Sequence, residues 1–493
     1  MRTFTLQAAR DYEAAHTADI PPADRPAYHL CPRIGWMNDP NGFCWYNGMY
    51  HIFYQYYPYA TNWGPMHWGH AVSKDLIHWQ YLPAALAPEA KCDSSGCFSG
   101  SALTLPDGRH LLMYTGVRKE TDDEMDKGIQ NQCLALGDGE NYTKYPLNPV
   151  LTGADLPEGF SEVDFRDPKI WQEEDGSYSC VTGCRAADGS GAILLFRSPD
   201  AFHWHFRAIL DRSRNEYGRM WECPDFFPLG GKHLILTSPQ DMDNVGMEFH
   251  NGNGVVCIAG DYNPKTDEFF RQSIASVDYG LDFYATQTTL APDGRRLMIA
   301  WMQNWDALAG QPSEWKWFGQ LTFPRELEWR DDRLIQRPAR ELDELHGRRV
   351  GYRHVRVHEE STLAGVYGRV ADMTVRVYPK PGASYGFFRI KFAKGSRHYT
   401  SVSYRPDSSV LHLSRVHSGL NRDFVHEREC QVRDRGGELE LRILLDRYSA
   451  EIFVNGGEQT LTTVIYTPQT ADGISFESDG EVLVDVEKYD LIL

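Results

Sequence analysis

Apolar and polar residues alternate over short stretches of this chain, and glycine-containing turns separate those stretches. One arrangement, a turn glycine followed by an apolar run, occurs five times, with the glycines at Gly48, Gly108, Gly176, Gly231 and Gly294. Each turn is Asn-Gly, Asp-Gly or Gly-Gly between two apolar runs, and such turns are the strongest local signal for a β-hairpin. The sequence therefore predicts five hairpins, spaced 55 to 68 residues apart.

The regular recurrence of these hairpins indicates a repeat architecture. Propeller blades hold four strands in about 40–50 residues, and longer loops extend the unit. We therefore expect the strand-rich residues 28–333 to form a five-bladed β-propeller. A second repeat, a Ser-x-Asp segment followed by Trp, relates residues 73–79 to residues 198–204 and predicts two Asx-type turns in outer hairpins.

The remaining parts of the chain have different patterns. Residues 1–27 contain a helical pattern from Leu6 to His16 and are expected to form an N-terminal extension packed on the surface. Residues 334–347 are predicted to form a linker helix closed by Gly347. Period-two alternation dominates residues 348–493 and predicts a β-sandwich. The expected fold class is all-β: a five-bladed β-propeller followed by a C-terminal β-sandwich.

Polar side chains recur together with the hairpins. Nine residues before the five turn glycines stand Asp39, Ser99, Asp167, Glu222 and Ala285. If the hairpins are equivalent, these positions lie at one level around a central axis, and three carboxylic acids converge there. Burying three acids together is costly unless they do chemistry. We therefore interpret Asp39, Asp167 and Glu222 as a catalytic site; the alternative is that each acid caps a turn of its own blade.

Composition restricts the class of partner. The net charge of −18 argues against nucleic acid and anionic membranes as partners. No apolar run approaches the roughly 18 residues that span a bilayer, and the first ten residues lack the apolar core of a signal peptide. The ten cysteines are scattered, so we expect reduced thiols in a cytoplasmic protein. Aromatic residues make up 13% of the chain and suit both β cores and stacking on sugar rings.

Taken in order, the motifs of the chain resemble glycoside hydrolase family 32, the β-fructofuranosidases, which include invertases and sucrose-6-phosphate hydrolases. The matching stretches are Trp36-Met37-Asn38-Asp39-Pro40-Asn41-Gly42, Phe53-Tyr54-Gln55, Phe98-Ser99-Gly100-Ser101, Arg166-Asp167-Pro168, Trp221-Glu222-Cys223-Pro224, Asp282-Phe283-Tyr284-Ala285, Pro324-Arg325-Glu326-Leu327 and Glu451-Ile452-Phe453-Val454-Asn455-Gly456-Gly457. The resemblance covers nearly the whole chain. It implies a five-bladed propeller followed by a β-sandwich, in agreement with the count of hairpins.

The resemblance also implies a role for each acid. Asp39 matches the nucleophile, Glu222 the general acid/base, and Asp167 the acid that holds fructose hydroxyls and stabilises the transition state. A retaining glycosidase needs one ionised carboxylate to attack and one protonated carboxyl to protonate the leaving oxygen. Arg166, next to Asp167, is expected to keep a carboxylate ionised. The implied reaction is hydrolysis of terminal non-reducing β-D-fructofuranosides through a covalent fructosyl-enzyme intermediate.

Further residues are expected to contact the sugar. Polar contacts to fructose are expected from Asn38, Gln55, Ser99 and Arg166. Candidate apolar walls, each with plain core packing as the alternative, are Trp63, Phe98 and Trp301. Sucrose, sucrose 6-phosphate and short fructo-oligosaccharides all remain as substrates. Candidate phosphate ligands are Arg118, Lys119 and Lys169.

Neither a metal nor a cofactor is expected. The histidines of residues 67–70, Cys92 with Cys97, and Cys180 with Cys184 lack the paired spacing of a zinc site. Three other functions remain as alternatives: fructosyl transfer through the same intermediate, a non-catalytic carbohydrate-binding propeller, and an inverting arabinosidase or xylosidase whose two carboxyls stand further apart. The sequence leaves the oligomeric state open.

Overall fold

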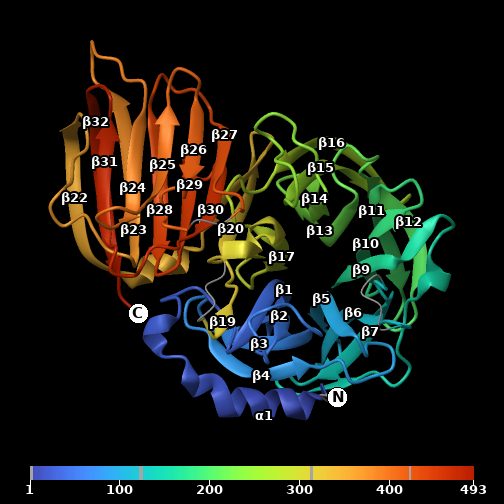
Figure 1. Cartoon of the computed structure of the whole chain (residues 1–493). Coiled ribbons are helices and arrows are strands. Elements are labelled where there is room, and N and C mark those ends of the chain that lie inside the picture. Colours follow the sequence, from blue (N-terminus) through green and yellow to red (C-terminus); the bar gives the residue numbers. More distant parts are fainter. Residues whose placement is uncertain (1–3, 122–125, 311–314, 421–422) are drawn as a thin grey trace.

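The computed structural model describes residues 4–121, 126–310, 315–420 and 423–493. Strands dominate it, so the predicted all-β class is confirmed. Figure 1 shows two parts, a ring of small sheets and, beside it, a pair of larger sheets. No helix in these described ranges is long and apolar enough to cross a membrane.

The ring is built by five sheets that follow one another along the chain. Their strand orders are β19-β1-β2-β3-β4, β5-β6-β7-β8, β12-β11-β10-β9, β13-β14-β15-β16 and β17-β18-β20-β21. The bounds are β1 Gly35–Tyr46, β2 Met49–Tyr57, β3 His67–Ser73, β4 Gln80–Leu86, β5 Gly96–Thr104, β6 His110–Arg118, β7 Ile129–Gly137, β8 Tyr142–Lys144, β9 Phe160–Gln172, β10 Tyr178–Ala186, β11 Gly191–Ser198, β12 His205–Arg212, β13 Met220–Leu229, β14 Lys232–Gln240, β15 Val256–Asn263, β16 Glu268–Ser276, β17 Tyr284–Leu290, β18 Arg296–Trp301, β19 Trp317–Phe318, β20 Arg325–Arg330 and β21 Arg333–Pro338. In Figure 1 the first strands of the sheets, β1, β5, β9, β13 and β17, surround the middle of the ring.

All five predicted hairpins are present, each joining the first two strands of a sheet. Their turn glycines, listed above, have φ values between 78° and 86°. Residues with a Cβ atom rarely adopt this left-handed region, so the turns favour glycine. This local requirement explains why the hairpins can be recognised in the sequence.

The two Ser-x-Asp segments form the same turn, as predicted. The carboxylate of Asp75 accepts hydrogen bonds from the backbone amides two and three residues later, at 3.0 and 2.8 Å. Asp200 does the same at 2.9 Å in both cases. These Asx-type bonds hold the chain reversal before the outermost strand of each sheet.

A short strand closes the ring. Strand β19 leaves the fifth sheet and pairs in parallel with β1, with Gly35 opposite Trp317 and Trp36 opposite Phe318. The end of the first domain is thereby fastened to its beginning, on the inner edge of the first sheet.

The N-terminal helix α1 spans Leu6–His16, the range predicted. It begins at Thr5, whose hydroxyl accepts a hydrogen bond from the amide of Ala8. Its side chains reach Ala84 on the outer strand β4: Glu13 accepts from the amide at 3.1 Å, and Arg10 donates to the carbonyl at 3.0 Å. The helix thus covers a sheet edge that would otherwise expose backbone groups. The other short helices of this domain are the 3₁₀ turns η1 Thr17–Asp19, η2 Pro22–Asp24, η3 Gly153–Asp155 and η4 Trp305–Gly310.

The linker helix predicted for residues 334–347 is wrong over most of its length. Strand β21 occupies residues 333–338, and only a 3₁₀ turn, η5 Arg340–Leu345, follows it. The reason is a hairpin turn without glycine: Asp331 and Asp332, between β20 and β21, have φ values of 53° and 55°. Aspartate tolerates this region, and two such residues make the turn that tight hairpins use.

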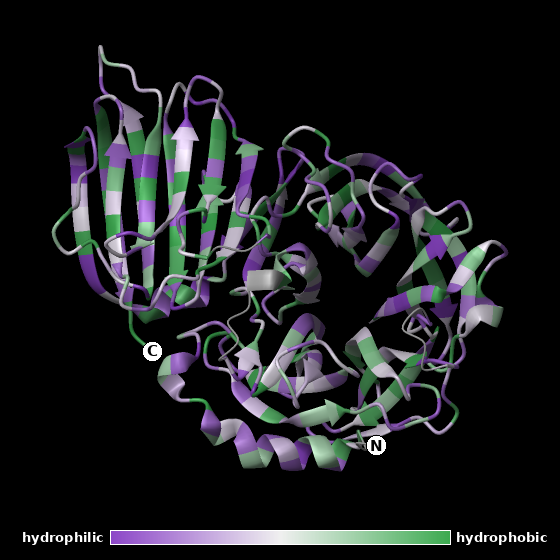
Figure 2. Cartoon of the chain, viewed as in Figure 1, coloured by the Kyte–Doolittle hydropathy of each residue, from purple (hydrophilic) through white to green (hydrophobic). Residues whose placement is uncertain are grey.

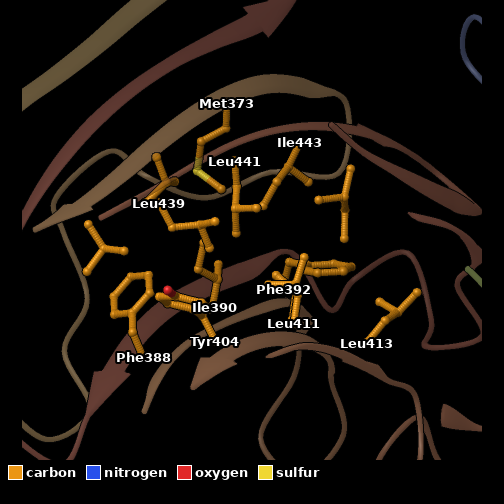
Figure 3. Packing of buried hydrophobic residues seen from close by; sticks show 14 of the residues in the cluster. Met373, Phe388, Ile390, Phe392, Tyr404, Leu411, Leu413, Leu439, Leu441 and Ile443 are labelled. Atoms are coloured by element: carbon orange, nitrogen blue, oxygen red, sulfur yellow. The ribbon is translucent and has the colours of Figure 1, made fainter. Parts of the chain in front are cut away.

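The second part consists of two packed sheets. Their strand orders are β22-β32-β23-β28-β29-β30 and β27-β26-β25-β24-β31. The bounds are β22 His346–Val357, β23 Ala371–Pro379, β24 Phe388–Lys394, β25 Thr400–Arg405, β26 Val410–Ser414, β27 Glu427–Gln431, β28 Leu439–Asp446, β29 Ser449–Val454, β30 Gln459–Val464, β31 Gly473–Ser478 and β32 Val482–Leu491. Figure 2 shows hydrophobic and hydrophilic residues alternating along several of these strands. Figure 3 shows the result: Leu441 and Ile443 of one sheet face Ile390 and Leu411 of the other, all buried.

A buried ionic network joins the two parts. The guanidinium group of Arg325 donates to Glu451 at 2.6 Å and to Asp278 at 3.1 Å. The ring of His29 lies between Glu451 and Asp446, at 2.9 and 2.8 Å. All five side chains are fully buried, and they come from segments far apart in the sequence. This network therefore ties the ring to the sandwich with directional contacts.

Candidate active site

Each of the five inner strands is irregular at the level of the recurring polar residues. The pairing register shifts between Met37 and Pro40, Phe98 and Gly100, Arg166 and Lys169, Glu222 and Asp225, and Tyr284 and Gln287. A β-bulge re-aims side chains that strict alternation would direct elsewhere, and bulges are common beside active sites. Four of the five positions found by counting back from the turns lie inside these bulges, and Glu222 is the last paired residue before its own.

Asp39 is held at both carboxylate oxygens. Ser99 donates to Oδ2 at 2.7 Å, and the side-chain amide of Asn38 donates to Oδ1 at 3.0 Å. The thiol of Cys223 also lies 3.5 Å from Oδ2. Burial and the negative charge of Glu222 raise the pKa of Asp39, while the three donors oppose that shift. Asn38 and Ser99 therefore lie beside Asp39, and their contacts to fructose stay a prediction.

Asp167 lies in the same group on a strained backbone. Its φ is 62°, and its side chain accepts a 2.9 Å hydrogen bond from the amide of Cys223. Burial, together with the charges of Glu222 and Asp39, raises the pKa of Asp167 to about 7. Cys223 thus contacts two of the acids at once, through its amide and its thiol.

Glu222 accepts hydrogen bonds from three different sheets. Arg166 donates to Oε1 at 3.0 Å, while Gln240 and Tyr284 donate to Oε2 at 2.9 and 2.6 Å. Its side chain is 15% exposed, so the carboxyl group is close to solvent yet firmly oriented.

Arg166 contacts two carboxylates, and neither belongs to its neighbour in the sequence. Its guanidinium group donates to Glu222 and, at 3.1 Å, to Asp164, and not to the neighbouring Asp167. The charge of Arg166 lowers the pKa of Asp167, but burial outweighs it. Successive residues of a strand point to opposite sides, so adjacency in the sequence is a poor guide to pairing.

The other proposed sugar contacts are a buried amide, that of Gln55, and a pair of aromatic rings, those of Trp63 and Phe98. Gln55 is buried and donates to the carbonyl oxygen of Cys97 at 3.0 Å, which places it beside the segment that carries Phe98 and Ser99. Trp63 is 45% exposed and meets Phe98 edge to face, with ring centroids 6.0 Å apart. These two rings therefore offer an accessible apolar surface next to the strand of Ser99.

Trp301 is a correction to the predicted walls. Its side chain is fully buried and packs against Trp36 and Trp305, with centroids 6.0 and 5.1 Å away. It cannot offer a face to a bound sugar, so it supports the layer behind the site. The same packing lies behind Trp36, whose indole donates to Asn38 at 2.7 Å.

Comparison with known proteins agrees with this geometry. The model of the glycosyl hydrolases family 32 N-terminal domain matches residues 29–338, and the model of the family 32 C-terminal domain matches residues 341–491. The chain belongs to glycoside hydrolase family 32. This family 32 chain is 41% identical over 463 residues to the raffinose invertase of Escherichia coli, with 93% of each chain covered.

Two further family 32 proteins are similar over most of their length. A sucrose-6-phosphate hydrolase of Escherichia coli is 37% identical over 445 residues, covering 90% of this chain and 89% of that protein. The solved structure of a Bombyx mori β-fructofuranosidase is 33% identical, with a TM-score of 0.81, covering 98% of this chain and 97% of that one.

Two contacts in this family 32 site were missed by sequence reasoning. Tyr284 and Gln240 both bind Glu222, yet neither was assigned. Tyr284 could have been found, because it directly precedes Ala285, the fifth position selected by the nine-residue count. Gln240 gives no such signal, since it depends on the pairing of β14 with β13.

The remaining candidates lie outside this group. Lys169 is mostly buried, with 12% of its side chain exposed, and forms an ion pair with Asp225 at 2.9 Å. Arg118 contacts Glu120 at 3.4 Å. Of the described residues, Asp343, His346 and Asp372 come close enough together to suggest a metal site. A guanidinium group already occupies that place, because Arg442 donates to both aspartates.

Proposed function

We propose that this chain hydrolyses terminal non-reducing β-D-fructofuranosides with retention of configuration, through a covalent fructosyl-enzyme intermediate. The observation that carries the proposal is the convergence of three acids from three sheets. Cys223 touches both Asp39 and Asp167, and Arg166 orients Glu222 beside them. The family 32 membership supports the same reaction.

Asp39 is proposed as the nucleophile. Ser99 and Asn38 fix the plane of its carboxylate, so one oxygen can be presented to the anomeric carbon of fructose. In the first step the carbon–oxygen bond to the leaving group breaks and a bond from the carbon to Asp39 forms. Glu222 gives its proton to the departing oxygen.

The second step reverses these roles. Glu222 takes a proton from water, the water oxygen attacks the anomeric carbon, and Asp39 leaves as a carboxylate. Asp167 is proposed to bind fructose hydroxyls through the transition state. Since its pKa is about 7, its charge depends on pH near neutrality.

The substrates that we propose are small sugars. The relatives described above are named for raffinose, for sucrose 6-phosphate and for β-fructofuranosides in general. The rings of Trp63 and Phe98 suit the apolar face of a sugar. We also propose a cytoplasmic site of action, because all ten cysteines are free thiols, as is usual in a reducing compartment.

The test is a comparison of initial rates with sucrose, raffinose and sucrose 6-phosphate at equal concentration. We expect Asp39→Asn to lose roughly 10³-fold or more of the wild-type rate. Asp243→Asn, which changes an exposed aspartate in the same way, should retain it. Near-normal turnover by Asp39→Asn would overturn the proposal. Release of glucose without an equal amount of free fructose would assign transfer to another sugar instead.

A further inference from the structure

The ring contains a cavity on the side of the acids that leads to the hairpin turns. It has a volume of about 510 Å³, and all five inner strands line it. The lining residues follow the acids along each strand, as Lys169 follows Asp167 and Asp225 follows Glu222. The cavity is therefore separate from the catalytic site and lies beyond a polar layer beneath it.

That polar layer uses all the hydrogen-bonding capacity of Lys169. Its ammonium group donates to Asp225 at 2.9 Å, to Gln287 at 3.2 Å and to the carbonyl oxygen of Thr288 at 2.6 Å. The same carboxylate oxygen of Asp225 accepts a 2.8 Å hydrogen bond from the amide of Thr288. The charge of Asp225 is thus already paired with that of Lys169.

A second cation in the cavity lacks such a partner. Arg296 donates one 3.3 Å hydrogen bond to Thr288 and stacks on the ring of Phe227 at 4.5 Å. Within the described residues it forms no ion pair, and its Nε has no hydrogen-bond partner. Burial lowers the pKa of both Arg296 and Lys169, and the negative charge of Asp225 opposes that shift without cancelling it.

We propose that this cavity binds a small oxyanion, a phosphate group either free or carried on a small sugar, with Arg296 as its main ligand. A guanidinium group stacked on an aromatic ring keeps its edge free for the paired oxygens of a phosphate. An anion there would neutralise a cation that is costly to leave partly buried and alone. The volume falls within the roughly 300–1,000 Å³ of small-molecule pockets.

The residues at the mouth of the cavity suit a phosphate that carries an organic group such as a sugar. Trp45 and Leu290, both lining residues, are 36% and 57% exposed. The ring of Trp45 suits the apolar face of a sugar, while Arg296, further inside the cavity, supplies the positive charge for the phosphate. This inference concerns binding and does not depend on the reaction proposed above.

The test is calorimetric titration of the full chain with inorganic phosphate and, separately, with glucose 6-phosphate. We expect saturable binding that Arg296→Gln weakens about tenfold or more, the effect of losing a charged hydrogen-bond donor. Arg349→Gln removes one exposed charge from the sandwich and should change nothing. Arg166→Gln should also retain binding, which separates this cavity from the catalytic site.

A second variant guards against misfolding of Arg296→Gln. Leu290→Glu places a negative charge at the exposed mouth and should weaken phosphate binding, whereas Leu290→Gln should not. Tighter binding of glucose 6-phosphate than of phosphate would assign a sugar phosphate; equal binding would assign free phosphate. The proposal fails if no saturable binding occurs, if Arg296→Gln and Leu290→Glu bind like wild type, or if only Arg166→Gln loses binding.

Discussion

The hydroxyl group of Tyr284 donates a 2.6 Å hydrogen bond to Glu222 and lies 3.0 Å from the carbonyl oxygen of Ser238. It carries one proton and cannot donate to both acceptors at once. When Glu222 is ionised, the proton is drawn to its carboxylate. When Glu222 is protonated, the hydroxyl can turn to Ser238, so the proton of Glu222 remains available for the leaving oxygen. The pair thus follows the two charge states that an acid/base residue must adopt.

Tyr284→Phe removes this donor and should lower kcat for sucrose roughly ten- to hundredfold, because a hydrogen bond to a charged group is lost. KM should change little, since Tyr284 is buried behind Glu222. The measurement is a pH–rate profile of Tyr284→Phe and of a control variant, each compared with wild type. Tyr385→Phe, which loses a hydroxyl bonded to Gly437 in the sandwich, is the matched control. An unchanged kcat for Tyr284→Phe would remove Tyr284 from the mechanism.

The roles of the acids can be separated by leaving group and by azide. Glu222→Gln should nearly stop hydrolysis of sucrose but spare the first step with a nitrophenyl fructoside, whose leaving group needs no proton. Added azide, which needs no base, should then restore turnover. Asp167→Asn should show no such rescue, because it moves no proton. Rescue of Asp167→Asn alone would mean that the two roles are exchanged.

Retention makes a geometric prediction of its own. The carboxyl groups of Asp39 and Glu222 should lie about 5–5.5 Å apart in a crystal structure of the active enzyme. Proton NMR of the first product should show the anomer of the substrate. A separation beyond roughly 6.5 Å, or an inverted first product, would assign the inverting mechanism instead.

The hairpins could be predicted because their turn chemistry is local. Gly108 has a φ of 85°, and the turn needs this conformation wherever in the fold its hairpin packs. The nine-residue count from it reached Ser99 because the inner strands run a similar number of residues from the bulge to the turn, although their total lengths differ. The hairpin turn at Asp331 and Asp332 escaped the same reasoning because it uses no glycine.

The errors concern contacts between distant segments. Trp301 is a candidate sugar wall by sequence, but β1 and η4 bring Trp36 and Trp305 against it, which no local pattern reveals. Arg166 is expected from the sequence to act on a carboxylate, but the sequence does not tell which one, because its partner Glu222 comes from another sheet. Such pairings depend on strand register and on bulges, and both are set by the whole fold.

His29 makes the stability of the fold depend on pH. Although burial disfavours its charged form, hydrogen bonds to Asp446 and Glu451 raise the pKa of His29 to about 9. Its folded pKa lies above the unfolded value of 6.5, so this stabilisation is complete below pH 6.5 and is lost as pH rises through 9.

His29→Gln should therefore lower Tm by several degrees at pH 6, because breaking a buried ionic contact costs about 3–5 kcal/mol. The difference from wild type should shrink at pH 10. Thermal unfolding followed by circular dichroism measures both values. His203→Gln, which changes an exposed histidine paired with Asp200, should have little effect at either pH. A loss of Tm that is equal at both values would show that the charge of His29 is not involved.

Asp167 should also make the stability of the fold depend on pH, but its substitution should raise Tm, whereas that of His29 should lower it. Its folded pKa of about 7 exceeds the ordinary value of 3.8 for an aspartate in the unfolded chain, so the folded state holds a proton that the unfolded state has released. The stability associated with Asp167 is present below pH 3.8 and is lost as pH rises through 7.

Asparagine in place of Asp167 cannot ionise, yet it can still accept the hydrogen bond from the amide of Cys223. We therefore expect Asp167→Asn to raise Tm at pH 8 by at least about 2 °C, and to change it little at pH 4. The exposed Asp243→Asn should show no such trend. A Tm difference that does not grow between pH 4 and pH 8 would mean that Asp167 is not the group that holds the proton in this cluster.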